Sequence, residues 1–281
     1  MISINPFTEI STFIPAIAMQ GYLVTMFILV IGATLFDVVH KKSAKYFFNN
    51  SVKAKKSATR NVGSSEKVSI AFKTATNEVL TSSEFCSTKR RLAHLLTMYG
   101  FLIFVTATVA MIFLYSSPTS MTPSIWPLAW HLGAAMLCIG GYWFWFFIRV
   151  DVSAEGNSPF RLIRADLFVV SLTLSTTFAL VWAYTQANGS ATWSVLTLIL
   201  YIFTTTILFG SVPWSKFSHM FFKPAAAMEK KMSEASGSRN NLPEPADRTD
   251  PAVRDSHSMQ LLKDAPLSMG LGIKREKPSH Y

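Results

Sequence analysis

Hydrophobic positions along this chain gather into five long stretches, and polar segments separate them. A helix needs about 20 apolar residues to cross the hydrocarbon core of a bilayer, and each stretch reaches that length. The pattern therefore predicts an all-α integral membrane protein with five transmembrane helices in a lipid bilayer. The predicted spans are about 13–39, 92–115, 125–150, 162–184 and 193–213.

The composition agrees with a membrane protein. Half of the 281 residues are hydrophobic, only 15% are charged and the mean hydropathy is +0.30. A soluble domain carries about 25% charged residues. The two cysteines, Cys86 and Cys138, form no C-x-x-C pair, so this chain does not provide the cysteine ligands of an iron–sulfur cluster.

The net charge of +10 would suit a nucleic-acid-binding protein, but the basic residues follow membrane topology instead. All 26 Lys and Arg fall in three segments, with 12 in 40–91, three in 149–164 and 11 in 216–281. A five-span chain places these segments on one side of the membrane. Because Lys and Arg favour the cytoplasmic side, we expect the N-terminus outside, the C-terminus in the cytoplasm and no nucleic-acid partner.

This topology divides the chain into two regions. Residues 12–228 form the predicted membrane bundle, which includes a basic cytoplasmic loop over 40–91. Residues 229–281 form a flexible cytoplasmic tail. The mildly amphipathic stretch 68–85 is a candidate for the membrane surface. The first span has no charged n-region and no cleavage signal, so we interpret it as a retained helix of a multi-pass protein in a prokaryotic plasma membrane.

Two histidines stand at matching depths near the predicted cytoplasmic face. His94 lies near the start of the second span, and His219 lies just past the end of the fifth. These spans run antiparallel, and two neutral imidazoles from facing helices are what a b-type haem requires. The alternative is a pair of interfacial histidines that bond to headgroups or backbone. We treat His94 and His219 as candidate ligands of a haem iron.

Both histidines lie in recognisable motifs. The residues around His94 read Arg-x-x-x-His-x-x-x-x-x-Gly-Phe over 90–101, and those around His219 read Pro-x-x-Lys-x-x-His-x-x-x-x-Pro over 213–224. Over about 12–228 the chain resembles the nitrate reductase gamma subunit superfamily, which includes the membrane cytochromes b of heterodisulfide reductase and of sulfite-reduction complexes.

The resemblance implies an electron-transfer subunit of an oxidoreductase complex. Its cofactor would be heme b, its substrate a membrane quinone, and its partner a cytoplasmic iron–sulfur or heterodisulfide-reductase-like subunit. Terminal catalysis would belong to that partner. Nitrate reductase members hold a second haem nearer the outer face, through a further histidine on each of the same two helices. This chain has Phe104 and Tyr201 at those positions, so one inner haem is expected and the outer one is open.

His131 is the one histidine near the predicted outer face, about six residues inside the third span. Three roles are open for it. It could ligate a second haem iron with Met111 or Met136 as the partner, contact a quinone, or make a structural hydrogen bond. His40, at the cytoplasmic end of the first span, is interpreted as a solvated interfacial histidine that could instead replace one member of the inner pair.

Basic residues bracket the inner histidine pair, and haem propionates pair well with such groups. Positive-inside topology explains the same residues without a haem. Asp166 with Arg164 is expected to form an interfacial ion pair, the alternative being a proton entry point. The basic residues beside the pair are Arg90, Arg91, Lys216 and Lys223.

Two further functions compete with electron transfer. The first is a haem-free membrane anchor or scaffold that recruits a redox complex, which the loss of the outer ligands favours. The second is a small transporter, which is disfavoured because the chain shows no inverted repeat.

Overall fold

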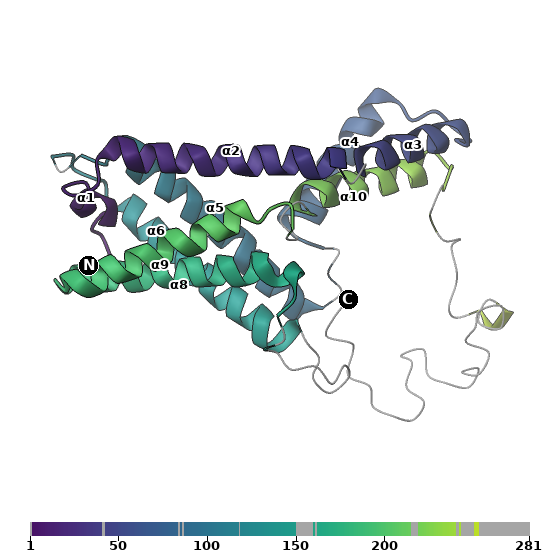
Figure 1. Ribbon diagram of the computed structural model, residues 1–281. Coiled ribbons are helices and arrows are strands. Elements are labelled where there is room, and N and C mark those ends of the chain that lie inside the picture. The colour runs from purple at the N-terminus through teal and green to yellow at the C-terminus, as the bar shows by residue number, and fades with distance from the viewer. Residues whose placement is uncertain are drawn as a thin grey trace.

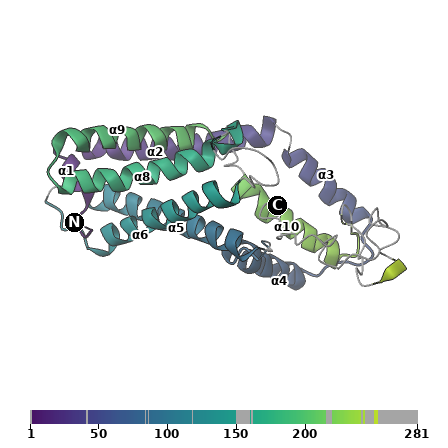
Figure 2. The same cartoon turned by 90° about the horizontal axis from the view of Figure 1, so that it is seen from below.

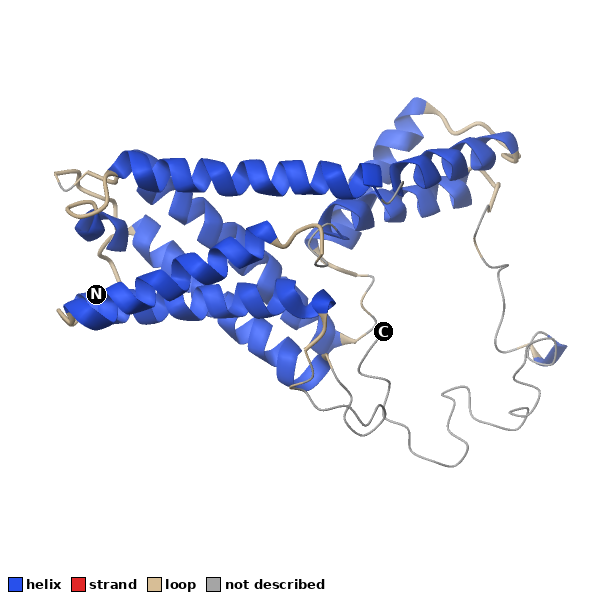
Figure 3. Cartoon of the chain, in the orientation of Figure 1, coloured by secondary structure: helices blue, strands red, loops and turns tan. Residues whose placement is uncertain are grey.

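The computed structural model describes residues 2–40, 43–83, 85, 87–117, 119–149, 160, 162–214, 219–239, 242 and 250–252, with the backbone alone at 38, 43–47, 165 and 219–222. Over these residues the chain consists of helices joined by turns, and no strand occurs among them (Figure 3). The prediction of an all-α protein is confirmed for this part of the chain.

Five helices in the described ranges are long and apolar enough to cross a membrane, which confirms the predicted number. α5 begins at Thr88, before the predicted start at 92, because its first polar residues continue the helix beyond the apolar stretch. α8 begins later than predicted because a short 3-10 turn, η3 (Arg164–Asp166), precedes it. The spans are α2 (Ala16–His40), α5 (Thr88–Leu114), α6 (Ile125–Trp143) continued by the π-helix η2 (Phe144–Ile148), α8 (Leu167–Ala187) and α9 (Ala191–Gly210).

The bundle has two chemically different ends (Figure 1). One end carries the short helix α1 (Pro6–Ile10) and the turns at 115–124 and 188–190, and Glu9 is the single charged residue of these segments. We call it the neutral end. At the other end α2, η2 and α9 finish and α5 and α8 begin, and every described Lys and Arg lies in or beyond it. We call it the basic end.

Within the bundle, α5 packs most closely on α6, and α8 packs on α9. Small residues permit the α5–α6 approach. A Cβ atom on Gly133 would lie 2.7 Å from the backbone nitrogen of Phe104, and one on Gly140 would lie 2.9 Å from the carbonyl oxygen of Ala93. α2 is peripheral, and most of its large apolar side chains are exposed, as suits a lipid-facing helix.

Beyond the basic end, the segment predicted as a loop folds into helices that form a cap with α10 (Figure 2). α10 lies between α3 and α4 and contacts both. The predicted boundary between bundle and tail, at 228, falls inside α10, and residues 253–281 lie outside the described ranges. The cap consists of α3 (Ser43–Lys56), α4 (Ser64–Thr74), the π-helix η1 (Ala75–Leu80) and α10 (His219–Ala235).

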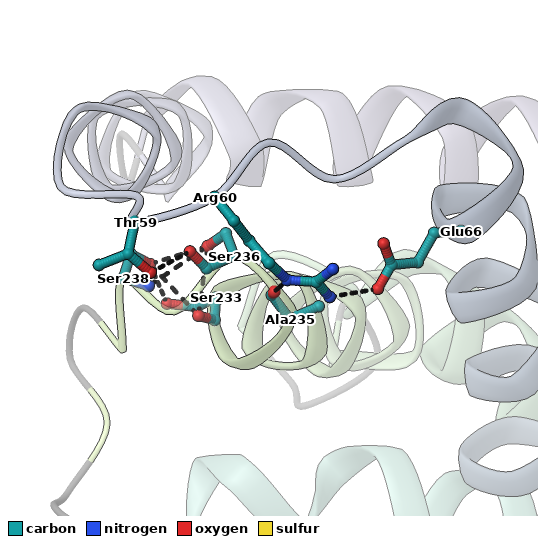
Figure 4. Close-up of polar contacts among 7 residues, drawn as sticks. All are labelled: Thr59, Arg60, Glu66, Ser233, Ala235, Ser236 and Ser238. Atoms are coloured by element: carbon teal, nitrogen blue, oxygen red, sulfur yellow. Dashed lines mark hydrogen bonds and ion pairs between the residues drawn. The ribbon is translucent and has the colours of Figure 1, made fainter.

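A latch of polar contacts joins the α3–α4 turn to the C-terminus of α10 (Figure 4). The backbone N–H groups of Thr59 and Arg60 donate to the carbonyl of Ser236 at 3.0 and 3.2 Å. The Arg60 side chain donates to the carbonyl of Ala235 and pairs with Glu66. These donors satisfy carbonyls that the end of a helix leaves unpaired, and the cation suits the negative end of the helix dipole.

Candidate functional site

His94 lies one and a half turns into α5, at the basic end of the bundle. The preceding residue, Ala93, is buried where α5 meets Gly140 of α6, so the helix at this point is fixed by packing. The His94 side chain is itself half-buried and points toward the cap-side segment 75–85. We call this segment, which comprises η1 and the turn that follows it, the strap.

Side chains of α5 hold the end of the strap. Arg91 donates from Nε to the carbonyl of Thr81 at 2.7 Å, and the Tyr99 hydroxyl donates to the carbonyl of Leu80 at 2.8 Å. Both carbonyls lie where η1 ends and would otherwise lack a partner in the helix. The strap is therefore fixed to α5 by side chains that precede and follow His94 in that helix.

Ser82 is the strap residue that contacts His94. Its Oγ lies 3.0 Å from Nδ1 of the imidazole, and only 1% of Ser82 is exposed. Its backbone has φ of +49°, a left-handed conformation that is uncommon for a residue other than glycine. Residues held in this way are concentrated at functional sites.

The strap also connects His94 to α10. The Phe85 ring lies 5.0 Å from the His94 ring, and the Lys223 ammonium lies 5.3 Å from the Phe85 ring. Lys223 lies one turn after the start of α10. Glu78 of η1 forms an ion pair with Lys231 of α10 at 2.8 Å. A flat macrocycle between α5 and α10 would therefore meet Phe85.

The other predicted inner residues are resolved to different extents. The backbone of His219 begins α10, one turn before Lys223. The side chain of His219 and the whole of Lys216 lie outside the described part of the chain. The structure thus links His94, through the Phe85 ring, to Lys223 in the helix that His219 begins. Arg90 and Arg91 are half-buried beside His94, and the Nε–H of Arg91 is engaged by the strap.

At the neutral end, Phe104 and Tyr201 belong to a buried aromatic cluster. Ring centroids of neighbouring members lie 5.2 to 6.5 Å apart, and the packing extends from α1 across α5, α6, α8 and α9. The indole of Trp130, fully buried, donates to Thr108 Oγ1 at 3.0 Å. Aromatic rings therefore fill the place where outer haem ligands would stand. The aromatic cluster consists of Phe7, Phe104, Trp130, Trp182 and Tyr201.

His131 lies at the edge of this cluster. Its ring contacts that of Trp130 edge to face at 5.0 Å, and Nδ1 lies 2.8 Å from the carbonyl oxygen of Pro127. A carbonyl only accepts, so Nδ1 carries the hydrogen. This is the structural hydrogen bond that was one of the three expected roles. A carbonyl bond at Nδ1 is also common in metal-ligating histidines, so the role as an iron ligand stays a prediction.

Asp166 does not pair with Arg164, which corrects the sequence-based expectation. Its carboxylate accepts a bidentate pair of bonds from Arg149, with Nε at 2.9 Å, and also accepts from the backbone N–H of Ile163. The Arg149 guanidinium stacks 4.2 Å from the ring of Trp145. The two charges are only 11% and 13% exposed, so the pair closes the basic end of α6 against α8.

An aromatic-lined pocket of about 210 Å³ lies between α6, η2 and α8, just above this ion pair. Its walls include Tyr142, Trp145 and Phe146, and Thr173 faces it from α8. Gly140, which touches Ala93, lies one turn of α6 away, so the pocket is at the depth of His94. A smaller cavity of about 40 Å³ lies between α2, α5, α8 and α9 and reaches Phe104 and Tyr201.

Sequence reasoning missed the residues that hold His94. Ser82 and Phe85 lie in a polar stretch with no motif, and the only signal was the mildly amphipathic pattern over 68–85, which we interpret as a candidate for the membrane surface. His40, in turn, ends α2 with its ring stacked on Phe36 at 5.2 Å.

No protein-family model, no curated protein and no solved structure matches this chain. Functional conclusions about the protein therefore rest on its residues and their geometry.

Proposed function

We propose that this protein is a membrane cytochrome b subunit that holds one haem at its basic end, with His94 and His219 as the axial ligands. The observation that carries the proposal is the contact chain from His94 through Phe85 to Lys223 in α10, the helix that His219 begins. A haem iron requires a neutral imidazole, and a partner at Nδ1 orients the ring for ligation through the other nitrogen.

In this proposal the basic end faces the cytoplasm and the N-terminus lies outside. The one-sided distribution of all 26 Lys and Arg supports this orientation. A haem would supply one-electron chemistry at His94, and Arg90 and Arg91 offer cations for its propionates. Phe85 would have to move aside or stack on the macrocycle. The aromatic cluster at the neutral end supports one haem in the chain and not two.

Quinone would supply or accept the electrons, and the pocket between α6, η2 and α8 is our candidate for its ring. The pocket is apolar and aromatic, which suits a neutral ring, and its depth matches that of His94. A cytoplasmic iron–sulfur or heterodisulfide-reductase-like protein would dock on the cap, whose described residues carry a large excess of Lys and Arg over Asp and Glu. This excess offers complementary charge to an acidic partner.

The test is to express the full chain with haem supplied, purify it in detergent and quantify haem per chain by its absorbance. We expect one haem, which is lost in His94→Ala and in His219→Ala. His131→Ala and His40→Ala are matched controls that should keep it. Two haems per chain, with one lost in His131→Ala, would assign His131 as an outer ligand.

The second candidate function is a haem-free anchor, which the aromatic cluster in place of the outer ligands favours. A wild-type chain that folds but shows no Soret band after haem-replete expression would establish the anchor and contradict the cytochrome.

A further inference from the structure

The Ser82 hydroxyl has two neighbours, and one assignment of its hydrogen serves both. Ser82 Oγ lies 3.0 Å from Nδ1 of His94 and 3.5 Å from the carbonyl oxygen of Val79. The carbonyl can only accept, so the hydroxyl is placed to donate to Val79 while its oxygen accepts from the imidazole. In this arrangement Nδ1 is the ring nitrogen that carries the hydrogen.

The backbone of the strap maintains this contact at a conformational cost. Ser82 has φ of +49°, where a side chain is disfavoured. Bonds on both sides hold it there, because α5 side chains take the carbonyls of Leu80 and Thr81, and the N–H of Phe85 donates to the carbonyl of Ser82. A glycine at 82 would relieve the backbone but would remove the hydroxyl that contacts His94.

We propose that Ser82 is a positioning residue that holds His94 in the Nδ1–H tautomer and thereby makes Nε2 the nitrogen that binds iron. This inference rests on the proposed function as far as the iron is concerned. An acceptor at Nδ1 fixes the plane of the ring and increases the basicity of Nε2. Losing such a partner typically costs roughly 10- to 100-fold in metal affinity.

The deciding variant is Ser82→Gly, because it removes the hydroxyl while suiting the positive φ, so that the strap keeps its fold. Ser82→Ala removes the hydroxyl and keeps the strain. Ser83→Ala is the matched control, since Ser83 is exposed and its bond in the strap comes from its backbone N–H. All variants are used as full chains.

The first measurement is made without haem. Nitrogen NMR of the histidine-labelled protein, with the His94 signal identified by its loss in His94→Gln, reports which ring nitrogen carries hydrogen. We expect Nδ1–H in the wild type and in Ser83→Ala, and a mixture of tautomers in Ser82→Gly and Ser82→Ala. An unchanged His94 signal in Ser82→Gly would overturn the proposal whether or not the protein binds haem.

The second measurement uses the haem-loaded protein. We expect Ser82→Gly to bind haem about 10- to 100-fold more weakly and to show a higher reduction potential, because a less basic imidazole stabilises the oxidised iron less. Equal affinity and potential in Ser82→Gly and Ser83→Ala would contradict the role toward iron. A wild type without haem would instead contradict the proposed function, while the tautomer measurement still decides the role of Ser82.

Discussion

The neutral and basic halves of the bundle bury their side chains in different ways. The neutral half is filled by the aromatic cluster and closed by α1, where Asn5 donates to the carbonyl of Tyr115 at 3.0 Å and Phe7 packs between Trp130 and Trp182. The basic half contains the strap, the Arg149–Asp166 pair and the larger pocket. Both π-helices, η1 and η2, also lie at the basic end.

The neutral half is thus built for a fixed arrangement, whereas the basic half holds the groups that can bind or titrate. Aromatic rings at 5 to 6 Å stabilise a fixed arrangement but offer few groups that bind or titrate. π-helices widen a helix locally and are frequent at functional sites. At the basic end, Ser82 follows η1 and contacts His94, and Arg149 follows η2 and pairs with Asp166. Four variants test the comparison, from the largest expected effect to the smallest.

Trp130→Ala should destabilise the neutral half most. Trp130 is fully buried and contacts three other members of the aromatic cluster, so its removal leaves a cavity that costs about 3–5 kcal/mol. Trp130→Phe, which keeps a ring, is the control. Denaturant unfolding in detergent measures the loss. If Trp130→Ala lowered the unfolding free energy by less than Trp130→Phe, the aromatic cluster would not be what stabilises the neutral half.

Arg149→Ala should cost about 3 kcal/mol at the basic end, because it leaves the carboxylate of Asp166 buried without its cation. The double variant with Asp166→Ala should cost less than the sum of the two single variants, since it removes both charges. A double-mutant cycle on unfolding free energies measures the difference. Strict additivity would mean that the two side chains stabilise their surroundings independently.

Asn5→Ala should loosen α1 and cost about 1–2 kcal/mol. The side chain caps the helix by accepting from the N–H of Phe7, and it donates to the carbonyl of Tyr115. We expect faster hydrogen exchange in α1 and at the neutral end of α5, with an unchanged rate in the strap. Faster exchange in the strap would show that the two halves are not independent.

Gly237→Ala should cost about 1 kcal/mol of folding free energy, because Gly237 has φ of +71°. A further cost arises because the new Cβ atom would clash with the Thr59 side chain in the latch. Gly189→Ala is the control at the neutral end, since Gly189 has φ of +69° and open space around it. The excess cost of Gly237→Ala, measured by thermal unfolding, is the contribution of the latch. Equal costs for Gly237→Ala and Gly189→Ala would mean that the Thr59 side chain moves aside without a measurable loss of stability.

Hydropathy predicted the spans well because a helix that crosses the hydrocarbon core of a bilayer requires a long run of apolar residues. The cap was harder to predict, since the pattern over 40–91 is set by contacts with α10, which follows about 130 residues later. The same reason explains the error at Asp166. Arg164 is close in sequence, but η3 turns the carboxylate toward Arg149, 17 residues away.

The sequence singled out His94 and His219 as candidate ligands, but it did not indicate which residues contact His94. Phe104 and Tyr201 could be recognised as departures from the pattern of the family that the sequence resembles. Their contact, with ring centroids 6.5 Å apart, could not be predicted, because it depends on how the whole bundle packs. Ser82 could not be predicted, because a serine between Thr81 and Ser83 carries no sign of a positive φ.

The aromatic cluster also has a consequence for energy conservation. A membrane potential acts on a transferred electron with about 2.3 kcal/mol per 100 mV when the electron crosses the whole bilayer. With rings instead of a metal centre in the neutral half, an electron relayed by a haem at His94 would travel only within the basic half. It would then do at most about half of that electrical work. A subunit of this kind would depend on the membrane voltage at most about half as strongly as one that carries electrons across the whole bilayer.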